Sequence, residues 1–451
     1  MKRKRFRKGI ITLLFLFIPL PLCARPLTLK DAVSIALKEN PNLQAARYTF
    51  SMAKEAEREA WTRFFPTVKF NYGYTRWNEE QHVNLKPVTI PPLAPGMEPV
   101  TIKPGNVVTS RQNEYEYTFS FQQPLFTGWA ITAAHRMALL AAKEAKLEAE
   151  ETRLEVAFNV KRAYFGILEA QELEKVAQTA VKQLSRHLFV AKNLFKEGVI
   201  PRNDLLKSQV ALAQAKQDLE KAKNNVAIAK ATLNAILHRD VTAPLEIEEM
   251  SLLNPPGLSL KEAIHRAMVL RPIVEAGIKE VEKGREGIRL AQSGYFPHLQ
   301  IEGAYRKHGN HPNCNGDDLT DAESWRITAG LEWTLFEMGR TRHQVEKARF
   351  GRLKALAQLN EIKDRVSLEV QKAFLDMETA KKNIETARKA VEQAKENFRA
   401  TEERYKEQID TSTEVLDAQN LLTQAQTYYH RAVYQYNVAV SRLFRAIGEE
   451  E

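Results

Sequence analysis

One short loop collects the side chains that are best suited to metal chemistry. The stretch RKHGNHPNCNGDDLTD (306–321) holds five of them: His308, His311, Cys314, Asp317 and Asp318. Imidazole, thiolate and carboxylate groups all bind metals, but their spacing here matches no strong zinc pattern. The few methionines show no clustered copper-type arrangement. A polar loop facing the outside of a cell is the simpler interpretation, so we predict no metal site.

Motifs for catalysis are also missing from the sequence. The chain has no glycine-rich phosphate loop, no nucleophile elbow and no paired catalytic carboxylates in a plausible pocket. We therefore predict that the protein is not an enzyme and needs no cofactor. The residues that matter for function must then lie in the long elements that make up most of the chain.

The N-terminus predicts export. Six basic residues within the first eight precede an apolar run at 10–22, which ends at Cys23 and Ala24. This is the pattern of a secretory signal peptide over residues 1–24, and the apolar run is too short to span a bilayer. Cleavage after Ala24 would remove Cys23. Acylation of Cys23 is the minor alternative, because the small residue expected before a lipoprotein cysteine is absent.

Charge and cysteine content narrow the choice of partners. The formal net charge of +10 includes six cations of the predicted signal peptide, which leaves +4 on the mature chain. Basic and acidic residues are interleaved along the predicted helices, so nucleic acid is not an expected partner. Without Cys23, Cys314 is the single cysteine, and no disulfide framework can hold the fold.

Two copies of one pattern fill the mature chain. A spacing of 231 residues relates the first two matches, in which 27–47 resembles 258–278 and 64–66 resembles 295–297. A spacing of 210 residues relates the next two, in which 124–129 resembles 334–339 and 195–209 resembles 405–419. The spacing falls by 21 residues only once, between Pro66 and Tyr115. A single insertion explains this difference. It contains IPPLAPGMEPVTIKPG, which we interpret as a proline-rich surface loop.

Each copy is expected to contain helix, strand, loop, strand, long helix, turn and helix. An uninterrupted helix of roughly 70 residues after Trp129 would be ~100 Å long. Its apolar residues recur at intervals of three and four, which is typical of coiled-coil packing. The predicted segments are helical repeat 1 (25–64), strands 1 and 2 with an extracellular loop (65–126), hairpin 1 (127–238), linker (239–257), helical repeat 2 (258–295), strands 3 and 4 (296–336) and hairpin 2 (337–448).

Four segments alternate apolar and polar residues over about 10 positions, the length that a tilted strand needs to cross a bilayer. We predict that ten side chains on the apolar face contact lipid: Phe70, Tyr72, Tyr117, Phe119, Phe121, Ile301, Tyr305, Ile327, Leu331 and Trp333. Four tryptophans beside the strands are expected at the membrane interfaces: Trp61, Trp77, Trp129 and Trp325. A soluble sheet packed on helices is the alternative, but little apolar sequence is left to cover it.

Four strands cannot close a barrel, and open strand edges are not tolerated in lipid. Oligomerisation is therefore required if the strands lie in a membrane. Three copies would supply a 12-stranded transmembrane β-barrel with a polar lining. The predicted fold class is mainly α with such a barrel, continued by a long α-helical coiled-coil barrel.

The duplicated layout, the boundary QPLFTGW (123–129) and the closing segment EVLDAQNLLTQAQTYYHRAVYQYNVAVSRL (414–443) resemble the TolC family of outer-membrane efflux channels. The resemblance covers essentially the whole mature chain. Thr127 departs from it, standing where an acidic residue is frequent. Gln408 departs as well, because the second turn often has glycine there, as the first turn does at Gly198.

The resemblance implies a homotrimer in the outer membrane of a Gram-negative cell, with a helical barrel that tapers to a closed tip in the periplasm. At this tip it would meet a periplasmic adaptor (membrane fusion) protein and an inner-membrane transporter of the RND, ABC or MFS class. The predicted function is a channel for efflux or type I secretion. No feature of the sequence indicates the transported substrate.

The resemblance also points to candidate residues near the two hairpin turns. Glu414 and Asp417 would form the periplasmic constriction; being three apart they share a helix face, so three chains would project six carboxylates. An ordinary acidic helix start is the alternative. Tyr405, Asp204 and Asp410 are candidates for contacts that hold the tip closed, with a hydrogen bond expected between Tyr405 and Asp204.

A second functional class stays open from the sequence alone. An exported coiled-coil hairpin can bridge membranes as a structural or adaptor protein without conducting anything. Such a protein should lack strands with aromatic belts on a lipid-facing side. The four alternating segments therefore favour the channel.

Overall fold

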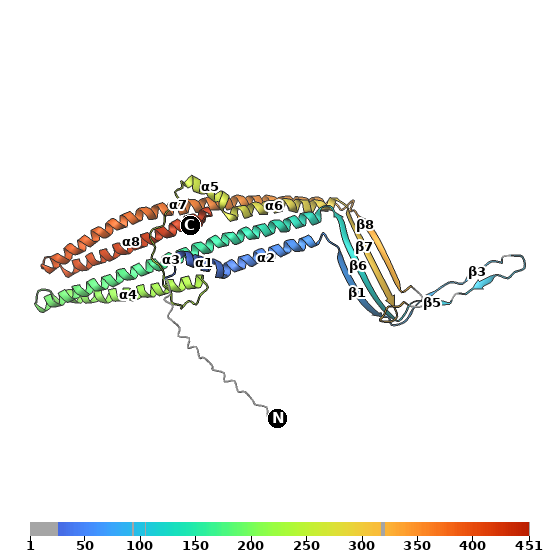
Figure 1. Cartoon of the computed structure of the whole chain (residues 1–451), viewed down its shortest axis with the longest axis horizontal. Helices are drawn as coiled ribbons and strands as arrows, with labels where there is room; N and C mark the ends of the chain where they lie inside the picture. The colour runs from blue at the N-terminus through green and yellow to red at the C-terminus, as the bar shows by residue number, and fades with distance from the viewer. Residues whose placement is uncertain (1–25, 93, 104, 317–320, 451) are drawn as a thin grey trace, which may run out of the picture.

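The computed structural model describes residues 26–92, 94–103, 105–316 and 321–450. It is an elongated molecule with long helices at one end, a four-stranded sheet next to them and a narrow β-ribbon beyond the sheet (Figure 1). The predicted signal peptide (1–24), including Cys23, lies outside the described residues.

Four helices form the first repeat: α1 (Leu29–Glu39), α2 (Pro41–Thr62), α3 (Ala130–Lys196) and α4 (Arg202–Ile236). Helices α2 and α4 both pack along α3, at its two halves (Figure 1). Helical repeat 1 (25–64) was predicted to hold one helix, but the structure breaks this helix at Asn40. Proline disfavours the helical conformation of the residue before it, and the Asn40 side chain caps α2 by accepting the N–H of Asn42 at 3.0 Å.

The second repeat has the same elements: α5 (Leu260–Leu270), α6 (Pro272–Gln292), the 3-10 turn η1 (Ser293–Tyr295), α7 (Arg340–Lys406) and α8 (Ser412–Ile447). The break recurs at Arg271–Pro272. Helices α3 and α7 each have 67 residues, so both hairpins have the same reach. Duplication of the sequence has thus produced two matching helical hairpins.

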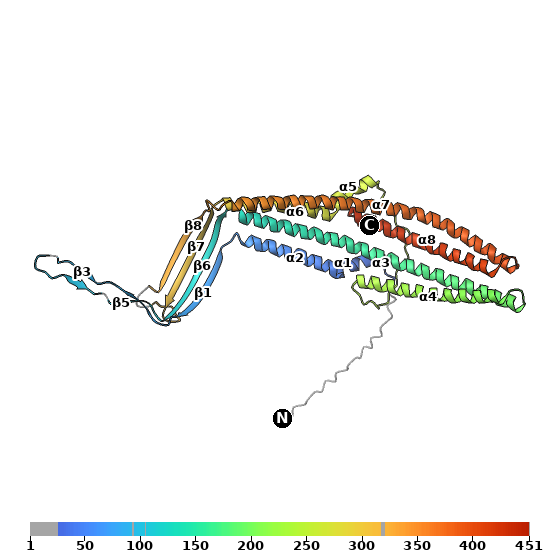
Figure 2. The same ribbon diagram turned by 180° about the vertical axis from the view of Figure 1, so that it is seen from behind.

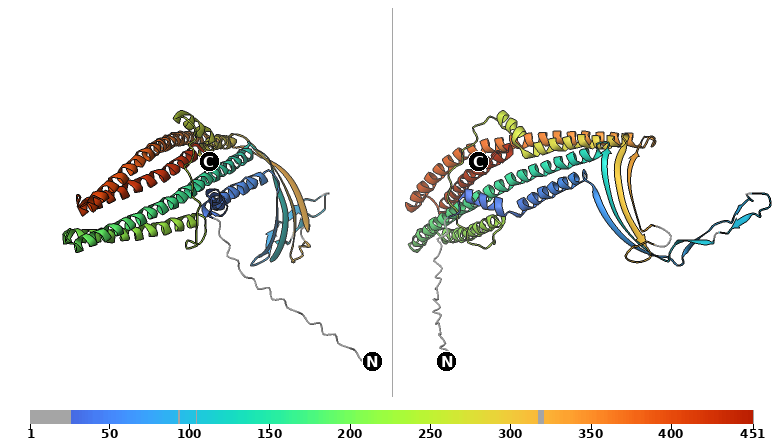
Figure 3. Two further views of the ribbon diagram at one scale, coloured as in Figure 1. Left: turned by 60° about the vertical axis from the view of Figure 1, so that its left-hand side comes forward. Right: turned by 45° about the vertical axis from the view of Figure 1, so that its right-hand side comes forward.

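The main sheet is antiparallel, with strand order β1-β6-β7-β8. Its strands are β1 (Thr67–Arg76), β6 (Asn113–Thr127), β7 (His298–Gly309) and β8 (Glu323–Glu332). The strands run from the ends of the helices towards the ribbon and bend along their length (Figures 2 and 3). Strands β1 and β8 are the edges of this sheet.

The insertion between β1 and β6 is a ribbon rather than the loop that the prolines predicted. Strand β2 (Gln81–Asn84) pairs with β5 (Asn106–Ser110), and β3 (Val88–Ile90) pairs with β4 (Val100–Ile102). β-Branched residues between the prolines favour these short strands. The ribbon projects beyond the end of the four-stranded sheet (Figure 1).

The helices share two apolar cores. One surrounds Tyr164 and Phe165 of α3, and the other surrounds Val370 of α7 and Val440 of α8. The predicted linker (239–257) joins the first core, since Leu245 is buried and Ile247 forms a parallel bridge with Leu27.

Among the described residues, no helix has the length and apolarity that crossing a membrane would require.

Candidate functional site

An apolar face runs across all four strands of the main sheet. Phe70 pairs with Phe119, Phe119 with Tyr305, and Tyr305 with Trp325, so one row crosses the sheet. The rings of Phe70 and Phe119 are 4.6 Å apart. Strand register places nine of the ten predicted lipid contacts on this face, and Trp333 directly follows β8. In the single chain Ile327 is 66% exposed and Leu331 is 64% exposed.

The opposite face is polar and internally hydrogen-bonded. Arg306 lies 2.7 Å from the Glu116 carboxylate, and Gln122 donates to Gln300 at 2.9 Å. Gln300 in turn donates to Glu302 at 2.9 Å. A sheet with one apolar and one hydrogen-bonded face can separate lipid from water. The facing of individual residues stays a prediction.

Tryptophans lie at both ends of this apolar face. Trp61, Trp129 and Trp333 are at the helical end; the indole N–H of Trp333 donates to the Tyr295 carbonyl at 3.1 Å. Trp77 follows β1 at the ribbon end, and Trp325 lies near the same end of β8. Two separate groups of indoles therefore bracket the strands.

The far ends of the hairpins are two turns of the same geometry. Gly198 ends the first long helix with φ 77°, and Gln408 ends the second with φ 64°. In both turns the residue after the left-handed one donates its N–H to the carbonyl five residues before it: Val199 to Leu194 and Ile409 to Arg404, each at 2.9 Å. Gln408 therefore occupies the glycine position without changing the turn.

The predicted constriction carboxylates begin α8. Glu414 and Asp417 are both exposed in the single chain. Glu414 also forms a capping box: its carboxylate accepts the Thr411 N–H at 3.0 Å, while the Thr411 hydroxyl accepts the Glu414 N–H at 3.4 Å. The capping box uses one carboxylate oxygen of Glu414, and the Asp417 side chain is exposed to solvent. Both carboxylates thus remain candidates for a ring.

The predicted hydrogen bond between Tyr405 and Asp204 is not formed in this structure. The Tyr405 hydroxyl is buried, and no hydrogen bond joins it to the Asp204 carboxylate. Asp204 lies 3.8 Å from Lys207, and Asp410 pairs with Arg404 at 2.9 Å. Burial raises the pKa of Tyr405, and the nearby Asp204 carboxylate raises it further. A role for these residues in closing the tip stays a prediction.

Tyr405 packs instead against a group that sequence reasoning missed. Its ring centroid is 4.9 Å from that of His187 on α3, and His187 Nε2 lies 2.8 Å from the Ser412 hydroxyl of α8. Ser412 is also 3.0 Å from Ser208 on α4. We call His187, Ser208, Tyr405 and Ser412 the inter-hairpin cluster. It joins the two hairpins just behind their tips.

The loop with metal-ligand side chains forms no ligand set in its described part. Cys314 is buried, and its N–H donates to the His311 carbonyl at 2.9 Å. No group of three histidine, cysteine or acidic side chains close enough for a metal occurs in the described part of the chain. Asp317 and Asp318, part of the predicted loop, lie outside the described residues.

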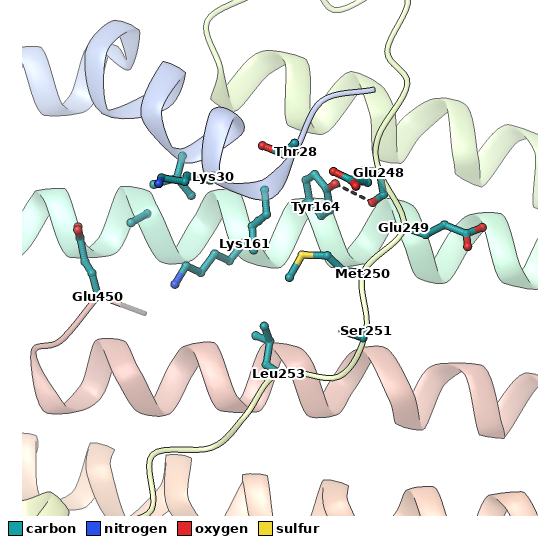
Figure 4. Close-up of a pocket in the computed structure, with 13 residues that line it drawn as sticks. Thr28, Lys30, Lys161, Tyr164, Glu248, Glu249, Met250, Ser251, Leu253 and Glu450 are labelled. Atoms are coloured by element: carbon teal, nitrogen blue, oxygen red, sulfur yellow. Dashed lines mark hydrogen bonds between the residues drawn. The ribbon is translucent and has the colours of Figure 1, made fainter. Parts of the chain in front are cut away.

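A cavity of about 660 Å³ lies at the middle of α3, between α1, the 248–253 segment and Glu450 (Figure 4). Its most buried polar group is Tyr164, whose hydroxyl lies 2.9 Å from the Leu27 carbonyl and 2.7 Å from that of Glu248. Burial raises the pKa of Tyr164 to about 12, so the phenol stays protonated. The Tyr164 phenol thus joins the N-terminal segment and the 248–253 segment at the wall of this cavity.

Residues 32–238 and 263–449 match the family model described as outer membrane efflux protein. The chain belongs to the outer membrane efflux protein family. This family consists of channels of the Gram-negative outer membrane, which are transport proteins rather than enzymes, as the sequence predicted. Its members form trimers and work in tripartite efflux.

The chain is similar to several known members of the family. It is 24% identical over 212 residues to outer membrane protein TolC of Vibrio cholerae, a match that covers 46% of this chain and 48% of that protein. The outer membrane channel CmeC of Campylobacter jejuni superposes with a TM-score of 0.77 at 16% identity, covering 93% of this chain and 85% of that one. The open state of the MtrE channel of Neisseria gonorrhoeae gives 0.74 at 16% identity, covering 93% and 89%.

One departure from the family pattern has a local explanation in this outer membrane efflux protein. Thr127 stands where an acidic residue is frequent, and its hydroxyl accepts the N–H of Ile131 at 3.4 Å. At the corresponding place in the second repeat, Glu337 accepts the N–H of Thr341 at 2.7 Å. Both side chains thus satisfy a free donor at the start of a long helix.

Proposed function

We propose that three copies of this chain form a channel across the outer membrane, continued by a helical tube into the periplasm. The observation that carries the proposal is the exposed apolar face of a sheet whose edges, β1 and β8, are both unpaired in the single chain. Unpaired backbone groups in lipid are costly, so β1 of one copy would pair with β8 of the next. The polar face, with Glu116 and Arg306, would then line the channel.

The two hairpins of each copy would supply the wall of the tube. Their tips would contact a periplasmic adaptor protein, and an inner-membrane transporter of the RND, ABC or MFS class would supply the energy. Glu414 and Asp417 of three copies would form the narrowest ring. A ring of carboxylates attracts cations and repels anions. The transporter, not this chain, would select the substrate.

A pair of neighbouring substitutions on β6 tests this proposal. Phe119→Arg places a charge on the proposed lipid face, where it costs roughly 2–4 kcal/mol at the middle of a bilayer, so assembly in the membrane should fail. Ser120→Arg points to the proposed lumen and serves as the matched control. It should assemble and alter single-channel conductance in planar bilayers.

Two results would contradict this proposal, each in a different part. Equal loss of assembly with both variants would overturn the facing of the sheet. A wild-type protein that assembles in the outer membrane yet gives no conductance, even after its tips are removed, would support the alternative of a structural or adaptor protein that conducts nothing.

A further inference from the structure

The outer half of the ribbon has two chemically different faces. Strand pairing joins Val88 to Ile102 and Ile90 to Val100, so these four side chains lie on one face. Thr89 and Thr101 form the pair between them on the other face, with their hydroxyl groups 3.2 Å apart. A purely solvated ribbon would not need this separation of apolar and polar side chains.

The apolar face of the ribbon is open in the single chain. Its exposed fractions are 60% for Val88, 40% for Ile90, 61% for Val100 and 52% for Ile102. The ribbon begins after Trp77, whose N–H donates to the Gln112 carbonyl at 2.8 Å, and Trp77 marks the outer end of the apolar sheet face. This face therefore projects into water, where a two-stranded ribbon by itself is only marginally stable.

The edges of the ribbon are poor sites for further strands. Pro87 directly precedes β3, Pro91 directly follows it, and Pro99 directly precedes β4. Proline cannot donate a backbone hydrogen bond, and strands of three residues offer short edges. Any partner that buries these apolar side chains must therefore pack against the face of the ribbon rather than add a strand to its edge.

We propose that the three ribbons of one trimer pack their apolar faces against one another and cap the outer mouth of the channel. This inference rests on the proposed trimer. The ribbon follows β1, an edge strand of the sheet, so its root lies at the seam between neighbouring copies. Three copies of the same apolar face would therefore surround the outer mouth of one trimer.

The dimensions allow the ribbons to meet. Twelve strands spaced 4.8 Å apart and tilted by about 40° close into a barrel of about 24 Å diameter, or about 12 Å from rim to axis. The chain from Trp77 to Ile90 can span about 40 Å at 3.3 Å per residue. Each ribbon is therefore long enough to reach the three-fold axis.

The second repeat supports a single bundle of three ribbons. The corresponding loop after β7 is short and folds back on the strand, with the Gly316 N–H donating to the His308 carbonyl at 2.9 Å. Cys314 in this loop is buried. Only the first repeat carries the insertion, so a trimer has three apolar ribbon faces rather than six.

Cysteine cross-linking of the full-length trimer tests the proposal. Val100→Cys places a thiol on the apolar face, and Thr101→Cys, the adjacent residue, is the matched control on the polar face. After mild oxidation, Val100→Cys should link up to about two of every three chains as disulfide dimers, the limit for one bond per trimer. Thr101→Cys should give only the background seen in wild type, whose Cys314 is buried.

Each result bears on the proposal in a defined way. Equal cross-linking at both positions, or none, in a protein that light scattering shows to be trimeric would overturn the ribbon cap and leave the channel intact. Loss of the trimer in wild type would overturn both. Protection of Val100→Cys from a water-soluble thiol reagent in cells, but not in purified trimers, would assign the face to lipid instead of to a second copy.

A conductance measurement provides a second readout. Val100→Asp should drive the capping faces apart and raise the open probability of the channel, with trimer content unchanged. Thr101→Asp carries the same charge on the polar face and should leave gating as in wild type. Identical behaviour of the two variants would contradict the cap.

Discussion

At the scale of single residues, the two repeats meet the same local requirement with different side chains. Thr127 and Glu337 each accept a free N–H at the start of a long helix. Gly198 and Gln408 each adopt a left-handed conformation at the end of one. At both positions where this chain departs from the family pattern, Thr127 and Gln408, the backbone therefore keeps the same conformation as in the other repeat.

Replacing Gln408 with glycine should stabilise the protein. A side chain at positive φ costs about 1 kcal/mol, and glycine removes this cost, although it also loosens the unfolded chain. We expect a net gain of roughly 0.5 kcal/mol, measured from the denaturant midpoint of the detergent-solubilised protein.

The reverse change at the first turn is the matched control. Gly198→Gln places the same side chain at φ 77° and should destabilise the protein by a net value of roughly 0.5 kcal/mol. A shift of both variants in the same direction would show that side-chain contacts, rather than backbone strain, determine the stability of these turns.

Residue types alone could not reveal the inter-hairpin cluster. His187 is one of two histidines in a 67-residue helix, and its partner Ser412 is 225 residues away. The carboxylates Glu414 and Asp417 were assigned by the family resemblance, and their three-residue spacing, which places them on one helix face, agrees with that assignment. Local spacing can be read from a sequence, whereas a contact between two hairpins depends on their packing.

At the scale of elements, patterns that are long and regular were predictable. The long helices, their hairpin partners and the four main strands follow from periodicity and from the positions of proline. The ribbon was missed because its outer strands have three residues each, between prolines that indicate a loop. The helix break at Asn40 was missed because the flanking apolar pattern runs through it.

The contact between hairpins should weaken in mild acid. Burial lowers the pKa of His187, whereas Glu402 of α7 opposes this shift. In an arrangement that exposes His187, its pKa would return to about 6.5. As the pH falls below 6.5, the exposed form gains a proton that the buried form resists, so acid favours separation of the hairpins. We expect open probability in planar bilayers to rise between pH 7.5 and pH values below 6.5.

His187→Gln is the control for this pH dependence. Glutamine can still hydrogen-bond Ser412 but does not titrate, so most of the rise should disappear. His135 is a second histidine of α3, beside Glu57 and far from the tips. His135→Gln should keep the wild-type response. An unchanged rise in His187→Gln would show that His187 does not cause the pH dependence.

At the scale of the whole molecule, duplication makes the two hairpins alike. The contact between the two hairpins of one chain nevertheless differs from the contact between hairpins of neighbouring chains in the proposed trimer. The 210-residue spacing relates His187 to Asn397 and Ser412 to Arg202. The seam within one chain therefore carries the inter-hairpin cluster, and the corresponding seam between chains of the proposed trimer carries different groups. A tube built from alternating seams should separate first at one kind of seam.

The proposed acidic ring predicts the ion selectivity of the assembled channel. Removing a charge about 4 Å from a passing cation in water changes its energy by about 1 kcal/mol, or roughly fivefold in occupancy. Glu414→Gln combined with Asp417→Asn should therefore shift the reversal potential in a salt gradient towards that of an unselective pore.

A charge change away from the tips provides the comparison. Glu220 is an exposed carboxylate of α4 that pairs with Lys223 at 2.8 Å. Glu220→Gln should leave the reversal potential near its wild-type value. Equal shifts in both proteins would locate selectivity outside the predicted constriction.

The equal lengths of α3 and α7 have a consequence for the cell envelope. Each helix has 67 residues and rises about 100 Å. The six turns that join the helices of the hairpins in the proposed trimer would thus end at the same level along the tube. In the proposed assembly, a transporter complex would therefore have to meet all six turns at one fixed depth, and an insertion of four residues into only one of the two helices would make that level uneven.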